Sequence, residues 1–191
     1  KYLPVLDPAD RKTIESAMLV DAPEAVSFIS SSVSRMDRLI NAILDLNRLG
    51  RRELKPEPLD MNAMTRGILE SLTHQITERN VEVAASMLPT VTADRLAMEQ
   101  VLGNLIDNAL KYLEPDRPGR LEIAADQQKN EMVIHIRDNG RGIAQEDIPK
   151  VFDIFKRVGK QDNPGEGMGL AYVKALVKRQ GGRIWRESEP G

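Results

Sequence analysis

The sequence contains no cysteine and little histidine, and its charges nearly balance. With no Cys among 191 residues, disulfides, thiolate zinc sites and cysteine nucleophiles are excluded. The two His residues lie far apart in the sequence, which speaks against a metal cluster built on histidine. The formal net charge of −2 gives no support for a nucleic-acid surface, so we expect no nucleic acid as a partner.

Long apolar runs are also missing. None approaches the ~20 residues that a membrane span needs, and the basic-then-apolar start of a signal peptide is absent. We therefore expect no membrane contact from these residues and a cytoplasmic location, whether or not a parent protein is membrane-anchored. The chain starts at Lys1 without Met, so we treat it as part of a longer protein.

A hydrophobic content of 41% and a charged content of 29% describe a soluble globular protein with one core and an appendage. The appendage is the N-terminal region, residues 1–50, in which Asp7 begins one helix signal and Asp21 begins a second, predicted over about 22–49. Residues of the second helix that alternate spacings of four and three, all apolar but the last, are Ala22, Val26, Ile29, Val33, Met36, Ile40, Ile43 and Asn47. This heptad seam favours a coiled coil or helical bundle over a helix lying on its own domain's core.

Residues 51–60 contain two prolines and are interpreted as a linker with room for a short strand. From 61 to 191 the pattern is mixed. It predicts helices over 61–79, 94–113 and 169–180, a short helix or turns over 148–155, and strands at 81–86, 89–92, 121–125, 132–138 and 183–185. Runs of helix and paired strand, without strict alternation, indicate an α+β sandwich.

The helix predicted over 94–113 carries an unusual polar side. Asn104, Asn108 and Lys111 follow at spacings of four and three, so they share one face of the helix. Asn oxygen is a hard ligand for Mg²⁺, and Lys neutralises phosphate. A polar stripe facing water explains this helix equally well when it is considered alone.

Two glycine-rich turns lie downstream of that helix. Asp138 ends a strand on its apolar side and begins the turn DNGRG at 138–142, where a carboxylate beside bare backbone suits an aminopurine. The stretch GEGMG at 165–169 leads directly into a helix, where backbone N–H groups can approach phosphates. Taken singly, the first is also a plain turn and the second a flexible loop, and the second is neither a Walker nor a Rossmann motif.

The ordered set NLxxNAxKY, DNGRGI, Phe152-x-x-Phe155 and GxGxGLA resembles the ATP-binding catalytic domain of bacterial sensor histidine kinases. That domain belongs to the superfamily shared with gyrase, Hsp90 and MutL ATPases. The stretch LDLNRL at 44–49 is similar to the second helix of the family's dimerisation and phosphotransfer domain. The resemblance implies a two-layer α/β sandwich of the Bergerat type for 61–191, preceded by a helical-hairpin or coiled-coil dimerisation segment.

The resemblance also implies roles for individual residues. Asn108 would be the Mg²⁺ ligand, with Asn104 and Lys111 on the phosphate side. Asp138 would bind the adenine amino group, and Arg157 would reach the terminal phosphate. Of these, the predicted catalytic set is Asn104, Lys111 and Arg157. The remaining predicted cofactor-binding residues surround the base or frame the triphosphate under a lid over 158–166: Tyr112, Gly140, Gly142, Ile143, Gly165, Gly167, Met168, Gly169 and Leu170.

Gyrase-type members carry Glu where Asn104 stands, and an amide cannot act as a general base near neutral pH. The resemblance therefore implies transfer of the γ-phosphoryl group of ATP to a histidine and then to an aspartate of a response regulator, within a homodimer. A degenerate kinase used as a dimeric docking module, or a Ser-directed kinase of the anti-sigma type, is the alternative.

Two departures from the family pattern matter. No acceptor-histidine motif occurs in this sequence, and His74 and His135 are assigned no catalytic role. The family's last strand is also missing after Gly191. We therefore predict that these residues bind ATP but cannot phosphorylate themselves.

Overall fold

The computed structural model describes residues 7, 14, 17–51, 53–128, 131–153, 156 and 167–189. The chain divides into two compact units, Lys1–Arg48 and Leu49–Gly191. In the part of the chain that the structure describes, no helix combines the length and the apolar composition that crossing a bilayer requires.

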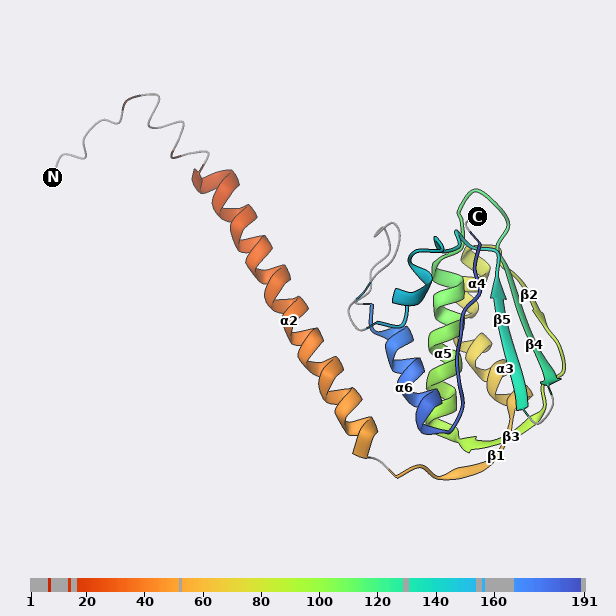
Figure 1. The fold of residues 1–191 in the computed structure, drawn as a ribbon. Helices are drawn as coiled ribbons and strands as arrows, with labels where there is room; N and C mark the ends of the chain where they lie inside the picture. The colour runs from red at the N-terminus through yellow and green to blue at the C-terminus, as the bar shows by residue number, and fades with distance from the viewer. Residues whose placement is uncertain are drawn as a thin grey trace. The chain divides into compact units, whose positions relative to one another are not determined.

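The N-terminal unit is dominated by one long helix, α2 (Ala22–Arg51), which a π-helical turn, Ala17–Asp21, precedes (Figure 1). The predicted start near Ala22 is confirmed, and the helix ends one residue beyond Gly50. The helix signal that begins at Asp7 falls largely outside the described residues. Apolar side chains of the seam are exposed to solvent, with exposed fractions of 62% for Val26, 60% for Ile29 and 61% for Met36.

The second unit begins with a strand pair. Strand β1 (Pro56–Asp60) pairs antiparallel with β3 (Thr90–Asp94), so the predicted linker contributes a strand to the domain that follows it. The main sheet has the order β2-β4-β5, from Glu82–Ala85, Arg120–Gln128 and Glu131–Asp138. Strand β2 is parallel to β4, and β4 is antiparallel to β5 with Ile123 opposite Ile136.

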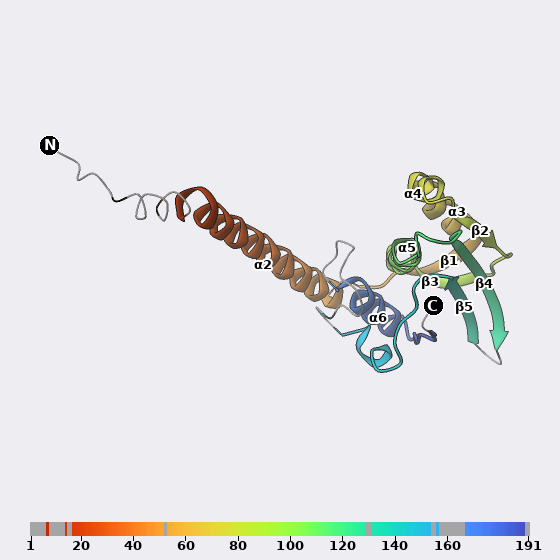
Figure 2. The same cartoon turned by 90° about the horizontal axis from the view of Figure 1, so that it is seen from above.

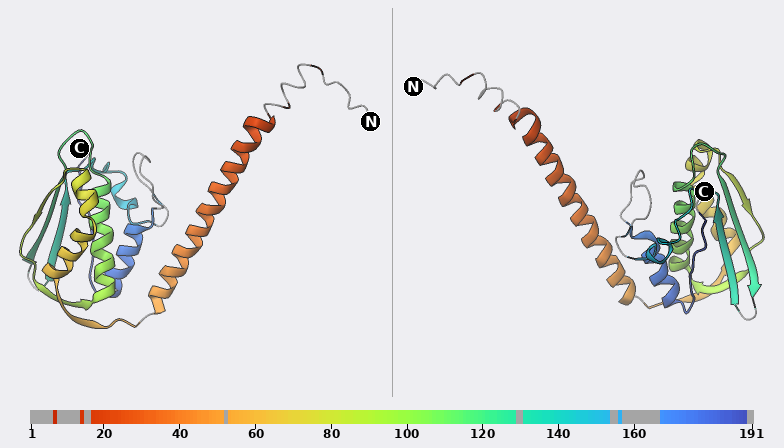
Figure 3. Two further views of the ribbon diagram at one scale, coloured as in Figure 1. Left: turned by 180° about the vertical axis from the view of Figure 1, so that it is seen from behind. Right: turned by 45° about the horizontal axis from the view of Figure 1, so that its top comes forward.

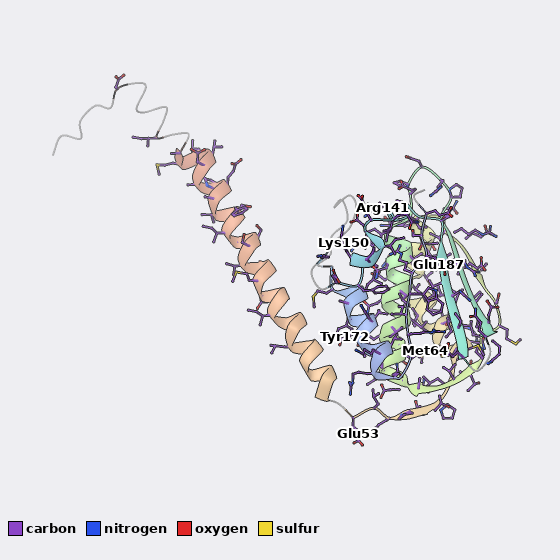
Figure 4. The ribbon with its side chains drawn as sticks, in the orientation of Figure 1. Glu53, Met64, Arg141, Lys150, Tyr172 and Glu187 are labelled. Atoms are coloured by element: carbon purple, nitrogen blue, oxygen red, sulfur yellow. The ribbon has the colours of Figure 1, made fainter. Side chains whose placement is uncertain are left out.

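Helices cover one face of this sheet: α3 (Met61–Ser71), α4 (Thr73–Glu78), α5 (Arg95–Lys111) and α6 (Gly169–Arg179). Figures 2 and 3 show the resulting helix layer and sheet layer, which confirm the predicted sandwich. The main core lies between the layers, where Leu59, Leu102, Ile106, Leu110 and Ile123 are fully or almost fully buried. Met64 of α3 belongs to the same core (Figure 4).

The structure corrects two predicted elements. The helix predicted over 61–79 is broken at Leu72, because the hydroxyl groups of Ser71 and Thr73 bond back to the carbonyls of Ile68 and Glu70 at 2.6 and 2.7 Å. The strand predicted at 183–185 is not formed, and residues 182–189 have no regular structure. The structure describes only a 3₁₀ turn, Ile148–Lys150, and the turns up to Asp153 in the 148–155 region.

Candidate functional site

Helix α5 is the element on which the candidate site is built. Asp94 caps it, as predicted, by accepting the N–H of Ala97 at 3.0 Å. One side of α5 is buried in the core through Val101, Leu102, Ile106, Ala109 and Leu110. Asn104, Asn108 and Lys111 lie on the other side and are half-buried, so they line a boundary with neighbouring segments and do not face open water.

The start of α6 lies directly against this polar side. A Cβ atom added at Gly169 would lie 3.3 Å from Oδ1 of Asn104 and 3.6 Å from Nδ2 of Asn108. The Nδ2 of Asn104 donates to the Gln100 carbonyl at 2.8 Å, which fixes the orientation of that amide. Gly167 has φ of 70°, a conformation that only glycine adopts at low cost. The predicted meeting of the asparagines with the second glycine-rich stretch is therefore present.

The first glycine-rich turn lies against the C-terminal end of α5. Arg141 donates its backbone N–H to the Tyr112 carbonyl at 3.1 Å. A Cβ atom added at Gly140 would lie only 2.4 Å from the same carbonyl oxygen, so the turn requires glycine there. Gly142 has φ of 65° and also requires it. Two separate glycine-rich segments thus converge on one helix.

The position of Asp138 differs from the expected one. Asp138 opposes the buried Leu121 across the ladder, as its parity predicts, but its side chain is exposed because the ladder ends at this pair. Its Oδ1 accepts the N–H of Gly140 at 3.0 Å. The carboxylate is therefore held in place at the rim of the domain and can accept a further hydrogen bond there.

Cationic side chains gather around Tyr112, which caps the C-terminus of α5. The Arg141 guanidinium lies 4.6 Å from the centre of the Tyr112 ring, and the Lys111 ammonium lies 5.6 Å from it. The Arg79 guanidinium donates to the Leu110 carbonyl at 2.7 Å and stabilises the helix end. Such a concentration of positive charge suits an anionic ligand.

Several predicted site residues fall outside the described part of the chain. These are Arg157, Gly165, Phe155 and the lid over 158–166. Of the remaining glycine-rich segment, Met168 is buried and Leu170 is half-buried. His74 is exposed on α4, and His135 lies on β5 with its Nε2 3.0 Å from the Asp126 carboxylate; neither was assigned a catalytic role.

The C-terminal segment contributes residues that the sequence analysis did not assign. Ser188 accepts the N–H of Ile143 through its hydroxyl at 2.9 Å, which ties this segment to the first glycine-rich turn. Burial lowers the pKa of the Arg186 guanidinium, while the nearby Asp138 carboxylate and the ionised form of the Tyr112 phenol act in the opposite direction. The sequence could have indicated this position of Arg186. Side chains of an extended segment alternate between two sides, which places Arg186 on the same side as Ile184 and Ser188.

The chain is similar to known proteins over most of its length. The model of the family "Histidine kinase-, DNA gyrase B-, and HSP90-like ATPase" matches residues 93–191. The methanogenesis regulatory histidine kinase FilI of Methanothrix harundinacea is 35% identical over 168 residues, covering 87% of this chain but 19% of FilI. The chain therefore spans about a fifth of that relative.

Two solved structures share the fold. Full-length ShkA in complex with AMPPNP is 29% identical, with a TM-score of 0.69 over 90% of this chain and 37% of ShkA. Histidine kinase ThkA in complex with response regulator protein TrrA is 20% identical, with a TM-score of 0.64 over 97% of this chain and 49% of ThkA. Because the family model matches residues 93–191, just over half of the chain, this chain belongs to the histidine kinase-, DNA gyrase B- and HSP90-like ATPase family.

Proposed function

We propose that the domain of residues 61–191 binds ATP with Mg²⁺ and acts as the catalytic domain of a protein histidine kinase. The observation that carries the proposal is the convergence on α5, where Gly169 lies against Asn104 and Asn108 while Gly140 lies against the Tyr112 carbonyl. The nucleotide-bound state of ShkA, which is 29% identical, supports a nucleotide in the same fold.

The polar side of α5 fits the phosphate end of the ligand. Asn108 would hold Mg²⁺ through its amide oxygen, and the metal would neutralise charge on the phosphates. Asn104 offers a second amide that cannot remove a proton from water, which favours transfer to a side chain over hydrolysis. Lys111 adds a cation beside them. The glycine-rich segment before α6, with Gly165, Gly167, Met168, Gly169 and Leu170, would frame the triphosphate, and Arg157 would reach its end.

The turn at the C-terminal end of α5 fits the base. Asp138 would accept the adenine amino group, because its carboxylate is held by Gly140 and exposed at the rim. Gly140 and Gly142 keep side chains out of this region, while Ile143 and Tyr112 supply apolar surface for the ring. The chain's own residues thus bind and orient the nucleotide at both ends.

Helix α2 would join two copies of the chain. Its exposed seam continues along the helix, with Val33 and Ile40 exposed by 59% and 55%. Apolar residues at heptad spacing are stable when a second helix covers them, which supports a homodimer.

A response regulator would then receive the phosphoryl group on an aspartate. The complex of ThkA with TrrA, which shares this fold, supports that kind of partner.

Titration with a fluorescent ATP analogue tests the base assignment. In Asp138→Asn, a donor replaces one acceptor oxygen and can face the adenine amino group, so we expect a loss of affinity of about tenfold or more. Asp126→Asn is the matched control, because Asp126 is 62% exposed beside His135 at the far end of the same strand pair. Affinity of Asp138→Asn within a factor of two of the parent would contradict the assignment.

Two further outcomes separate the alternatives. If ATP·Mg²⁺ failed to bind the parent at millimolar concentration, a degenerate docking module would replace the kinase. If mass spectrometry of the longer protein after ATP treatment found an acid-stable phosphate, a Ser-directed kinase would replace it. An acid-labile phosphate is the result that we expect.

A further inference from the structure

The segment that follows α6 places alternate side chains toward the site. Ile184 packs against the small core between α5 and α6. Ser188 accepts the N–H of Ile143 in the first glycine-rich turn at 2.9 Å. Arg186 lies between them and is half-buried, whereas its neighbours Trp185 and Glu187 are exposed (Figure 4 labels Glu187). The register of the segment therefore directs Arg186 inward.

The surroundings of Arg186 are those of the proposed base site. Burial lowers the pKa of its guanidinium, and the Asp138 carboxylate and Tyr112, both near it, oppose that effect. Among the residues that the structure describes, none forms a hydrogen bond or ion pair with this guanidinium. A guanidinium has five N–H donors. No nitrogen of Arg186 is buried without a partner, so these donors are open to water or to a ligand. Its donors therefore suit an acceptor that a ligand supplies.

We propose that Arg186 is a specificity-determining residue of the base site, donating to a ring nitrogen of adenine beside the amino group that Asp138 accepts. The inference rests on the proposed function. In adenine, the 6-amino donor lies between two acceptors, N1 and N7. Asp138 alone would accept any amino group within reach. The acid and the guanidinium together recognise an amino group only where an acceptor lies next to it.

The first test compares two arginines of the same segment. Arg186→Met and Arg183→Met make the same chemical change, but Arg183 is 71% exposed and pairs with Glu131 on the surface. In ATP titrations of the whole chain we expect Arg186→Met to lose about tenfold in affinity, as removal of a hydrogen bond from a charged donor does. Arg183→Met should stay within a factor of two. Equal effects of the two variants would overturn the proposal.

The second test changes the ligand and needs no variant to fold. 1-deaza-ATP and 7-deaza-ATP each replace one ring nitrogen with carbon. We expect the parent to bind one of the two about tenfold more weakly than ATP and the other nearly as well. The weakened analogue and ATP should bind Arg186→Met alike. Unimpaired binding of both analogues to the parent would overturn the proposal.

The same titrations separate this inference from the function on which it rests. If the parent does not bind ATP, the proposed function fails. If the parent binds ATP and Asp138→Asn loses affinity while Arg186→Met does not, only the inference about Arg186 fails. A loss in Arg186→Met that disappears when AMP replaces ATP would assign Arg186 to the phosphates and would also overturn it.

Discussion

Gly140→Ala tests whether the close approach between the first glycine-rich turn and α5 is required. A Cβ atom at this position would lie 2.4 Å from the Tyr112 carbonyl oxygen, 2.7 Å from Oδ1 of Asp138 and 3.0 Å from the Tyr112 carbonyl carbon. Two of these three atoms are backbone, so a change of side-chain rotamer cannot relieve the contact. The turn must move away from the end of α5.

The cost of that movement follows from the contacts that it breaks. Overpacking of a tight site costs about 1–3 kcal/mol. Loss of the 3.1 Å bond from the Arg141 N–H to the Tyr112 carbonyl adds about 1 kcal/mol. We therefore expect Gly140→Ala to lower the free energy of unfolding by about 2–4 kcal/mol, measured by urea denaturation. ATP affinity should fall as well, because Asp138 and Tyr112 move with the turn.

Gly103→Ala is the matched control. Gly103 lies inside α5, and a Cβ atom there would meet no heavy atom within 4 Å. Alanine is favoured over glycine within a helix by about 0.5–1 kcal/mol, so this variant should unfold at a higher urea concentration than the parent. A Gly140→Ala protein as stable as the parent, with unchanged ATP affinity, would refute the packing of the turn against α5.

Three further substitutions test the ends of the helices by urea denaturation. Asp94→Ala removes the cap of α5 and the acceptor of the Lys55 N–H at 2.9 Å. It should lower the free energy of unfolding by about 2–4 kcal/mol, and a decrease below about 0.5 kcal/mol would contradict these two contacts. Arg79→Met removes the donor to the Leu110 carbonyl and should lower the free energy of unfolding by about 1 kcal/mol. An unchanged free energy of unfolding would contradict the stabilising role of this hydrogen bond. Hydrogen bonds, chiefly from the Ala63 backbone N–H, lower the pKa of Asp60, so its stabilisation is present above the ordinary carboxyl pKa of about 4 and is lost as the pH falls through the lowered value. Asp60→Asn should therefore reduce the fall in stability between about pH 5 and pH 2, and an unaltered pH profile would exclude that role.

Much of the fold was predictable because its signals are local. The cap at Asp94 and the apolar side of α5 follow from residue types and a period of 3.6, and both are present. The break at Leu72 was not predicted. It depends on two side-chain hydroxyl groups that donate hydrogen bonds to nearby backbone carbonyls and not to water. Periodicity reports which side of a helix is apolar, and it does not report such competition.

The site was predictable to a similar degree. That Asn104 and Asn108 share a helix face follows from spacing alone, but their meeting with Gly169 is a contact between distant segments that only the family resemblance indicated. The exposure of Asp138 depends on where the ladder ends, which strand parity cannot show. Arg186 was overlooked because the predicted strand ended at residue 185; alternation continued to Ser188 would have placed Arg186 on the side of Ile184.

Helix α5 is fixed at both ends by groups from other segments. At its start, Asp94 accepts the N–H of Lys55 next to β1, and its own N–H donates to the Gln180 side chain at the end of α6 at 2.8 Å. At its C-terminal end, the Tyr112 carbonyl accepts the N–H of Arg141. Its 17 residues extend about 25 Å at 1.5 Å per residue, so the helix connects these two junctions as one stiff body. Within this unit, a displacement of β1 therefore acts on the start of α5 through the part-buried Lys55–Asp94 hydrogen bond, and the polar side that the nucleotide would occupy lies on the same stiff helix.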